Sequence, residues 1–353
     1  MSGPITTQKI TASMRVPKLM LRLARQLPML ILLGLAVHLI LPQLTTLESS
    51  LKVIKNMTWW ALALAVGLQI LSYVGSGYLI SSLASISPPR LNIGRSIVIT
   101  LAASSVGLVA GGMVGNAAAV YRWTRSNGVE KEGALMASWL PSLFNNAILA
   151  LLAVAGVLHL LIVHELSTLQ AIGFSLTLVV LVGAMGAIVW GVHHRPAFVE
   201  LLARISRSWA SLLRRPYDPT TTTDTTARIF GAWDVLRTGG WHRPVLGAVL
   251  NTGFDMATLF LLFVAAGHSV SPGVLLTGYG LPLLLGKVTF LPGGVGIVEG
   301  TMAALYNGLG VPNAVTVLVI LAYRIISFWV PTFLGFPLVI YLQRTTQPVE
   351  ETQ

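Results

Sequence analysis

The chain has 353 residues, of which 54% are hydrophobic and 10% are charged, and its mean hydropathy is +0.76. Soluble proteins average about 25% charged residues, so this composition excludes a soluble globular protein and indicates a multi-pass membrane protein. The absence of cysteine excludes disulfides, thiolate chemistry and cysteine-ligated metals. The net charge of +11 comes mainly from arginines at the ends of apolar segments. We interpret it as setting orientation and attracting anionic headgroups, with no nucleic-acid partner.

The chain opens with a basic tail, residues 1–27, which we expect to be cytoplasmic. The first membrane half, residues 28–192, begins with a span at 28–41 that lacks a small-residue cleavage site and is therefore interpreted as retained. Further spans are predicted from Trp59 to about Ile80, from Ala134 to Leu161 and from Gln170 to Val192. Between the first two of these, the apolar segment 96–120 is rich in small residues, with a break at Gly111, Gly112, Gly115 and Asn116.

Residues 193–243 form the one long polar stretch, rich in arginine, which the positive-inside rule places in the cytoplasm. Its apolar residues from Phe198 to Leu212 repeat at helical spacing, which favours a helix on the membrane surface or on the cytoplasmic ends of the bundle. Residues 216–226 read as a linker. The second membrane half, residues 244–343, contains apolar segments at 244–267, 274–290, 297–309 and 314–342, and a short polar tail follows at 344–353.

The most informative stretch is Phe290 to Glu299, FLPGGVGIVE. Pro292, Gly293, Gly294 and Gly296 fall within five positions, which a continuous helix tolerates poorly. A break at membrane depth persists only where protein or a water-filled cavity surrounds the freed backbone groups. We therefore predict a broken helix beside a wet cavity, with a tight interhelical turn as the alternative.

A shift of 182 residues places Gly111-Gly112 on Gly293-Gly294 and Gly128-Val129 on Gly310-Val311. If 96–120 crossed the membrane fully, the arginine-rich stretch would lie outside, against the positive-inside rule. We therefore predict an all-α membrane bundle of two inverted repeats, with six full spans and two re-entrant segments near 96–120 and 275–309. Eight full spans are the alternative. Both termini are expected in the cytoplasm and the protein in the cell (inner) membrane.

Four charged residues lie within the apolar segments of the second half: Asp255, Lys287, Glu299 and Arg324. Intramembrane ionisable residues are rare and usually functional. We predict that Glu299 pairs with Arg324 and that Lys287 lies near Asp255, and we assign all four as candidate substrate-binding residues. Arg324 or Lys287 would grip an anionic headgroup. Pairs that only fix helix packing are the structural alternative.

The quoted motif FLPGGVGIVEG, followed by GLGV and AYRIISFWVPTFLG, resembles the flippase-like transmembrane domain of lysylphosphatidylglycerol synthases. The resemblance is strongest over about residues 286–336 and fainter across 96–146. It implies movement of charged lipids, aminoacylated or anionic, between leaflets. The family often has a Gly-Glu pair at the first break, where this chain has Gly115-Asn116. Since the sequence ends at Gln353 without a soluble synthase domain, we expect no lipid synthesis.

We therefore expect a flippase-like transporter of phospholipids, with a membrane scaffold for a separate lipid- or glycan-modifying enzyme as the alternative function. The sequence contains no P-loop, zinc motif, GxSxG or acidic pair with catalytic spacing, so no enzyme activity, metal or cofactor is predicted. The identity of the lipid, the energy source, and association with a second copy or a partner enzyme are left open.

Overall fold

The structure, a computed structural model, describes residues 57–85, 91–163, 166–212, 230, 234, 240–288 and 292–345, and the regular elements within these ranges are helices. The predicted first span at 28–41 lies outside the described residues. So do the basic tail at 1–27, the linker at 216–226 and the chain after 345. The remaining predicted spans and both hairpins can be compared with the structure, apart from residues 289–291 at the second break.

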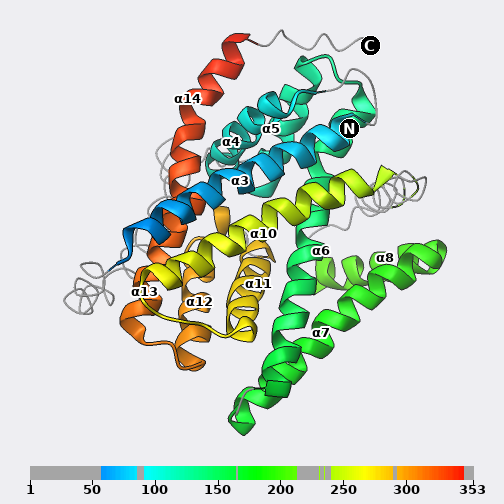
Figure 1. Ribbon diagram of the computed structural model, residues 1–353. Helices are drawn as coiled ribbons and strands as arrows, with labels where there is room; N and C mark the ends of the chain where they lie inside the picture. The colour runs from blue at the N-terminus through cyan, green and yellow to red at the C-terminus, as the bar shows by residue number, and fades with distance from the viewer. Residues whose placement is uncertain are drawn as a thin grey trace, which may run out of the picture. The chain divides into compact units, whose positions relative to one another are not determined.

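The first repeat consists of α3 (Trp59–Ala84), α4 (Ile93–Val109), α5 (Met113–Ser126) and α6 (Lys131–Val163), as Figure 1 shows. Helices α7 (Thr168–His193) and α8 (Arg195–Leu212) follow it. The second repeat consists of α10 (His242–Ala265), α11 (Pro272–Val288), a short 3-10 turn η2 (Pro292–Gly294) and α12 (Ile297–Gly308). It ends with α13 (Asn313–Arg324), a π-helical segment η3 (Ile325–Trp329) and α14 (Val330–Thr345).

Five helical stretches in the described part are long and apolar enough to cross a membrane: α3, α6, α7 as far as Gly191, α10 and the continuous rod from Asn313 to Thr345. The protein is thus a polytopic helical membrane bundle, as predicted. Only 6% of the α7 span is buried, against 39% of the α3 and α10 spans. Helix α7 therefore presents mostly apolar side chains to its surroundings, as suits a helix in contact with lipid.

The two predicted re-entrant segments are helical hairpins whose ends lie together. In the first, Arg95 Nε near the start of α4 donates to Asn127 Oδ1 beyond the end of α5, at 3.1 Å. In the second, a Cβ added to Gly278 of α11 would lie 2.4 Å from the ring of Tyr306 near the end of α12. Each hairpin therefore enters and returns on one side, which supports re-entrant segments over eight full spans.

The internal repeat is visible in the backbone. Helix bounds in the second repeat follow those of the first after the shift of 182 residues, and α6 at 131–163 corresponds to the rod at 313–345 without a change of length. The left-handed glycines also correspond: φ is +87° at Gly111 and +64° at Gly293, and it is +87° at Gly128 and +89° at Gly310. The repeat predicted from two dipeptides is confirmed.

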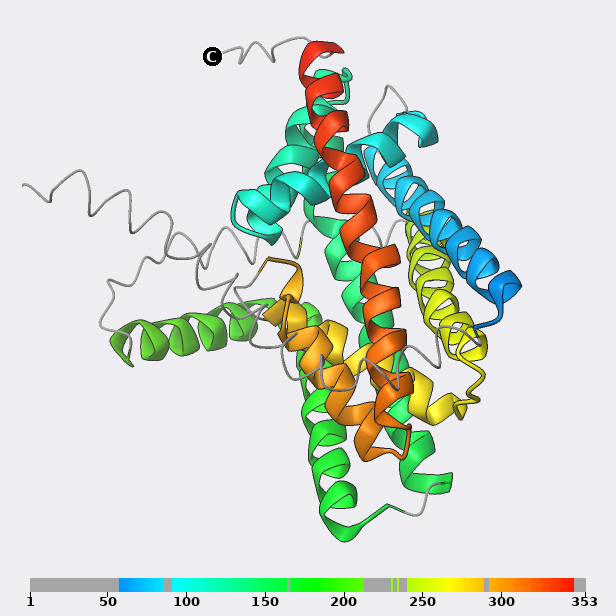
Figure 2. The ribbon, with the colours of Figure 1, turned by 90° about the vertical axis from the view of Figure 1, so that its left-hand side faces the viewer.

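The two repeats are inverted with respect to one another. Helices α3 and α10 lie side by side and antiparallel in Figures 1 and 2. The backbone N–H of Thr58 donates to Ala265 O at 2.9 Å at one end of this contact, and Ser72 Oγ donates to Asn251 O at 2.9 Å further along. Each hairpin also packs on the long helix of the other repeat, α11 on α6 and α4 on α14.

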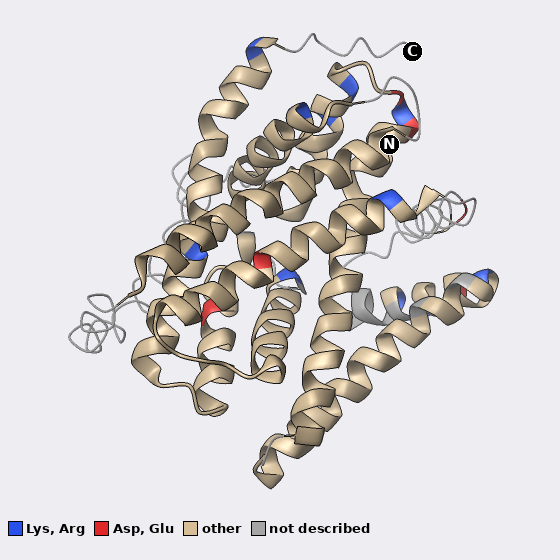
Figure 3. Cartoon of the chain, viewed as in Figure 1, with Lys and Arg blue, Asp and Glu red and all other residues tan. Residues whose placement is uncertain are grey.

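The basic residues gather at one side of this bundle. Arg95 Nη2 donates to Thr345 Oγ1, so the end of α14 lies beside the start of α4. The helix ends on this side carry Arg95, Arg125, Lys131, Arg243 and Arg344. Figure 3 shows blue segments at these helix ends and tan ribbon at the opposite ends. We call this the basic side. The described helix ends on the opposite side, at 57–60, 158–163, 166–170, 264–274 and 306–314, contain no Lys or Arg.

The antiparallel contact of α3 with α10 depends on close backbone approach. A Cβ on Gly75 would lie 2.6 Å from Asn251 N, whereas a Cβ on Gly67 of the same helix would meet nothing within 4 Å. We predict that Gly75→Val lowers the stability by about 1–3 kcal/mol through overpacking. Gly67→Val makes the same helix-propensity change and is the control. Thermal unfolding in detergent checks both, and equal midpoints would contradict the close approach.

Candidate functional site

The second helix break is held by a buried ion pair. Arg324 Nε donates to Glu299 Oε1 at 2.5 Å, and Arg324 Nη2 donates to the carbonyl of Gly293 at 3.0 Å. The other carboxylate oxygen of Glu299 accepts from Gly296 N at 2.6 Å. The guanidinium also stacks over Phe328, 4.4 Å from the ring centre. The pair therefore satisfies backbone groups on both sides of the break, in a place where water is scarce.

The first break also has partners for its backbone groups, but without charged side chains. Gly111 and Gly112 both have positive φ, and Gly112 N donates to Gly107 O at 2.7 Å. Asn116 N donates to Gly112 O at 3.1 Å, which starts α5. Positions 117 and 142, which correspond to Glu299 and Arg324, hold alanine and serine. The first hairpin is therefore not tied to its neighbouring long helix by an ion pair.

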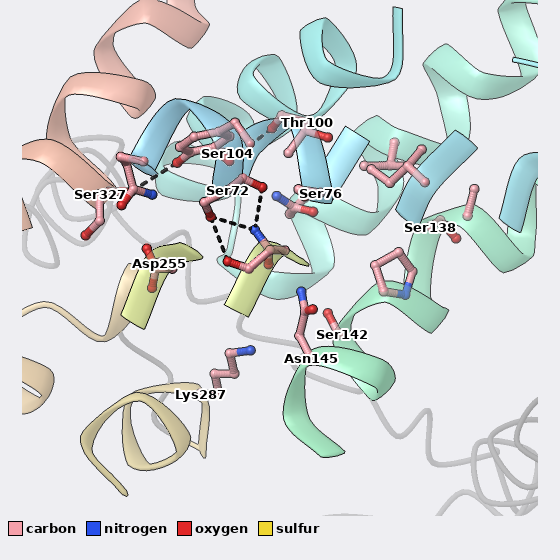
Figure 4. A pocket seen from close by; sticks show the side chains of 18 residues that line it. Ser72, Ser76, Thr100, Ser104, Ser138, Ser142, Asn145, Asp255, Lys287 and Ser327 are labelled. Atoms are coloured by element: carbon pink, nitrogen blue, oxygen red, sulfur yellow. Dashed lines mark hydrogen bonds between the residues drawn. The ribbon is translucent and has the colours of Figure 1, made fainter. Parts of the chain in front are cut away.

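A polar cavity of about 270 Å³ lies between the first hairpin, α3 and α6, with the second repeat forming its floor. Figure 4 shows its hydroxyl-rich wall, which includes Ser72, Ser76, Thr100, Ser104, Ser138 and Ser142. Only Ile80, Val120, Ala137 and Pro141 among the lining residues are apolar. A polar hollow thus exists inside the bundle, but neither Glu299 nor the glycines of the second break line it, so its predicted place beside that break is wrong.

Two of the four predicted charged residues line this cavity. Lys287, in the last turn of α11, donates from Nζ to Asn146 Oδ1 at 2.7 Å. Asp255, in the middle of α10, accepts at Oδ2 from Tyr323 at 2.6 Å and from Tyr279 at 2.8 Å. Figure 4 shows both residues on the same side of the cavity. Lys287 and Asp255 therefore share one cavity, with Asn146 and the two phenols as their hydrogen-bond partners.

The other predicted site residues lie elsewhere. Arg324 and Glu299 form the predicted pair, but neither lines the cavity, and Arg324 is 5% exposed. Asn116 lines the cavity from the first turn of α5. The breaks turn at glycines with positive φ, namely Gly111, Gly112, Gly293, Gly294 and Gly296. Gly115 lies in the first turn of α5, where a Cβ would come 2.3 Å from Ala110 O. Pro292 begins the 3-10 turn η2.

The sequence interpretation missed most of the cavity wall because its serines carry no periodic or charge signal. A comparison of the two repeats position by position could have identified these residues. Ser138 corresponds to Ile320 and Pro141 to Tyr323 after the 182-residue shift, and Asn116 corresponds to Val298. These second-repeat side chains belong to a buried apolar cluster. The first repeat therefore keeps space at these positions, where the second repeat is filled.

Outside the bundle, α8 carries charged residues on an exposed surface. Arg195 forms an ion pair with Asp234, and Arg204 pairs with Glu200 one turn away at 2.5 Å. The hydrogen bond from Arg204 lowers the pKa of the Glu200 carboxyl below its usual value. The ring of Phe198 lies over Gly191, where a Cβ would come within 2.2 Å of it. The Phe198 contact places the start of α8 against the end of α7.

Comparison with known proteins identifies the family. The family model described as "Lysylphosphatidylglycerol synthase TM region" matches residues 30–335, and the chain belongs to this family. It is 33% identical over 88 residues to a UPF0104 membrane protein of Pyrococcus horikoshii, which is 25% of this chain and 26% of the relative. A UPF0104 membrane protein of Methanocaldococcus jannaschii is 23% identical over 160 residues, 44% of this chain and 48% of the relative. These alignments thus span less than half of the relatives' length.

We predict that Glu299 and Arg324 are energetically coupled. Glu299→Gln or Arg324→Met alone leaves a poorly hydrated partner charge, and each change should cost about 3–5 kcal/mol. The double variant should lose clearly less than the sum of the two. A double-mutant cycle from chemical or thermal unfolding in detergent measures the coupling. Additive losses would contradict a direct pair.

Proposed function

We propose that this member of the lysylphosphatidylglycerol synthase TM region family moves a charged phospholipid between the leaflets of a membrane. The lipid headgroup would enter the polar cavity while its acyl chains stay in the bilayer. The observation that carries the proposal is the hydroxyl-lined cavity inside a membrane bundle, with one cation and one anion at its floor. The comparisons establish the family and the membrane location, and the transport step is our inference from the cavity.

The cavity chemistry supports a phosphate-bearing headgroup. The Lys287 ammonium has three N–H donors, and its hydrogen bond to Asn146 uses one of them. We assign it to a lipid phosphate. The Asp255 carboxylate suits a headgroup amine or hydroxyl. The serine and asparagine side chains can replace water around the remaining polar atoms, which lowers the desolvation cost of bringing a headgroup to membrane depth.

The architecture supports transport more than a fixed anchor. Inverted repeats with broken helices recur in transporters, whose sites lie near the bilayer midplane at the repeat interface. Here Lys287 and Asp255 come from the second repeat, and the serine wall comes from the first. A headgroup in the cavity would therefore contact both repeats, so a movement of one repeat against the other would change its surroundings.

We also propose an orientation. The basic side carries Arg95, Arg125, Lys131, Arg243 and Arg344, so the positive-inside rule places it in the cytoplasm. The cavity lies among the first turns of α6, from Ala137 to Asn145, and in the later turns of α3. It therefore lies in the cytoplasmic half, in what we take to be the cell membrane, and receives lipid from the inner leaflet.

A scaffold for a separate enzyme is the second candidate function. Helix α8 favours it, because α8 follows the little-buried α7 and exposes Arg204 and Glu200, whose side chains are 68% and 62% accessible. Deletion of residues 196–236 distinguishes the two functions. If the purified deletion variant still moves lipid while function in cells is lost, α8 docks a partner. If the variant and the intact protein both move no lipid, the transport proposal fails.

The transport proposal predicts lipid movement by the purified protein alone. In liposomes that contain a headgroup-labelled anionic phospholipid, the wild type should expose inner-leaflet label to an external quencher faster than empty liposomes do. Lys287→Gln should slow this exchange by about tenfold or more, since a hydrogen bond to a charged group is worth about 1.5–3 kcal/mol. The measurement is the fluorescence loss after quencher addition, at equal protein-to-lipid ratios.

Lys131→Gln is the matched control, because it removes the same charge from an exposed helix start outside the cavity. It should exchange lipid at the wild-type rate. Lys287→Arg keeps the charge and should retain part of the activity. Equal rates for Lys287→Gln and wild type would remove Lys287 from the site, and a wild-type rate equal to that of empty liposomes would overturn transport.

A further inference from the structure

We infer that the Glu299–Arg324 ion pair is a latch that closes a counterpart of the cavity in the second repeat and opens when the binding site faces the opposite side. This inference deepens the proposed transport and rests on it. It explains why this buried ion pair does not line the cavity. It also assigns a role to this pair of charged residues, which the second repeat has and the first repeat lacks.

The pseudo-two-fold axis defines where the counterpart lies. Applying the 182-residue shift to the part of the cavity wall on α6 and α5 places Ser138 on Ile320, Ser142 on Arg324 and Val120 on Met302. The counterpart thus lies between α12 and α13, toward the side opposite the basic side. Ile320 is 3% exposed and Met302 is fully buried. These two residues of the counterpart are therefore packed in this structure, while the first-repeat cavity has a volume of about 270 Å³.

The ion pair is placed where it can keep these helices together. Glu299 lies in the first turn of α12, and Arg324 is the last residue of α13. The pair joins the inner end of the hairpin to the long helix. The same guanidinium also donates to the Gly293 carbonyl, so it contacts the break as well. Arg324 is followed directly by the π-helical segment η3. π-Helical segments often mark functional sites.

The first repeat shows what the same elements look like without the pair. Ala117 and Ser142 replace Glu299 and Arg324 there, and Ser142 faces the cavity that separates α6 from the hairpin. Transporters built from inverted repeats alternate by moving one repeat against the other around a site near the midplane. Exposure of the site to the opposite side would then require α12 to separate from α13, which breaks the pair. The latch therefore holds the protein open toward the basic side.

Exchanging the residues between the repeats tests the latch directly. Glu299→Ala with Arg324→Ser gives the second repeat the residues of the first, and Ala117→Glu with Ser142→Arg gives the first repeat the latch. The native chain contains no cysteine, so a single reporter cysteine can be introduced into each protein. Ser138→Cys reports on the cavity, and Ile320→Cys, at the corresponding position of α13, reports on its counterpart.

The proteins are reconstituted in liposomes and labelled with a membrane-impermeant maleimide from either side. With the native latch, Ser138→Cys should react from the basic side and Ile320→Cys should be protected. Removing the latch should raise labelling of Ile320→Cys from the opposite side by about tenfold, within the usual range of coupling between two states. Adding the latch to the first repeat should lower labelling of Ser138→Cys by a similar factor. The four-residue exchange should reverse the accessible side.

Two results would overturn the latch. One is unchanged protection of Ile320→Cys after latch removal, in a protein whose Ser138→Cys still reacts at the native rate. The other is that Ser138→Cys is labelled at the native rate after the latch is added to the first repeat. This measurement leaves the second repeat intact, so it still tests the latch if latch removal prevents folding. Labelling requires no lipid movement. A wild type that moves no lipid but changes sides as expected would therefore overturn transport and keep the latch.

Discussion

The structure depends on satisfying the backbone where two helices break inside an apolar bundle. Each unpaired N–H or C=O in hydrocarbon costs several kcal/mol, so a break needs partners of its own. The first break finds them within its own backbone, through Gly112 and Asn116. The second recruits Glu299 for the Gly296 N–H and Arg324 for the Gly293 carbonyl. The most conspicuous charges in the sequence are thus explained first by the break they support.

The inverted arrangement follows from how the repeats pack. Each hairpin lies on the long helix of the other repeat, and one pair of corresponding residues donates a hydrogen bond across this contact in both repeats. Ser105 of α4 donates to Thr332 O at 2.5 Å, and Lys287, its counterpart in α11, donates to Asn146 on α6. A shift of one hairpin is therefore transmitted to the other repeat. Helix α7 is the additional span between the repeats, and because of it the second repeat enters the membrane from the opposite side. Little of α7 is buried against the rest of the bundle.

Much of this fold could be predicted from the sequence, because long apolar runs, left-handed glycines and arginine placement are strong local signals. The helix bounds, the repeat, both hairpins and the pairing of Glu299 with Arg324 are confirmed by the structure. The location of the cavity could not be predicted, since it depends on which repeat carries small side chains at facing positions. The sequence interpretation gave all four charges to the substrate, whereas the structure places only Lys287 and Asp255 in the cavity.

This division of the four charges suggests how one fold can serve both binding and conformational change. A site that must release its ligand cannot also hold its charged groups in tight ion pairs, because the ligand would have to compete with a permanent partner. Lys287 and Asp255 are instead held by neutral amide and phenol groups, which leave their charges available to a headgroup. Glu299 and Arg324 neutralise each other and so affect the energy of the hairpin rather than that of the ligand.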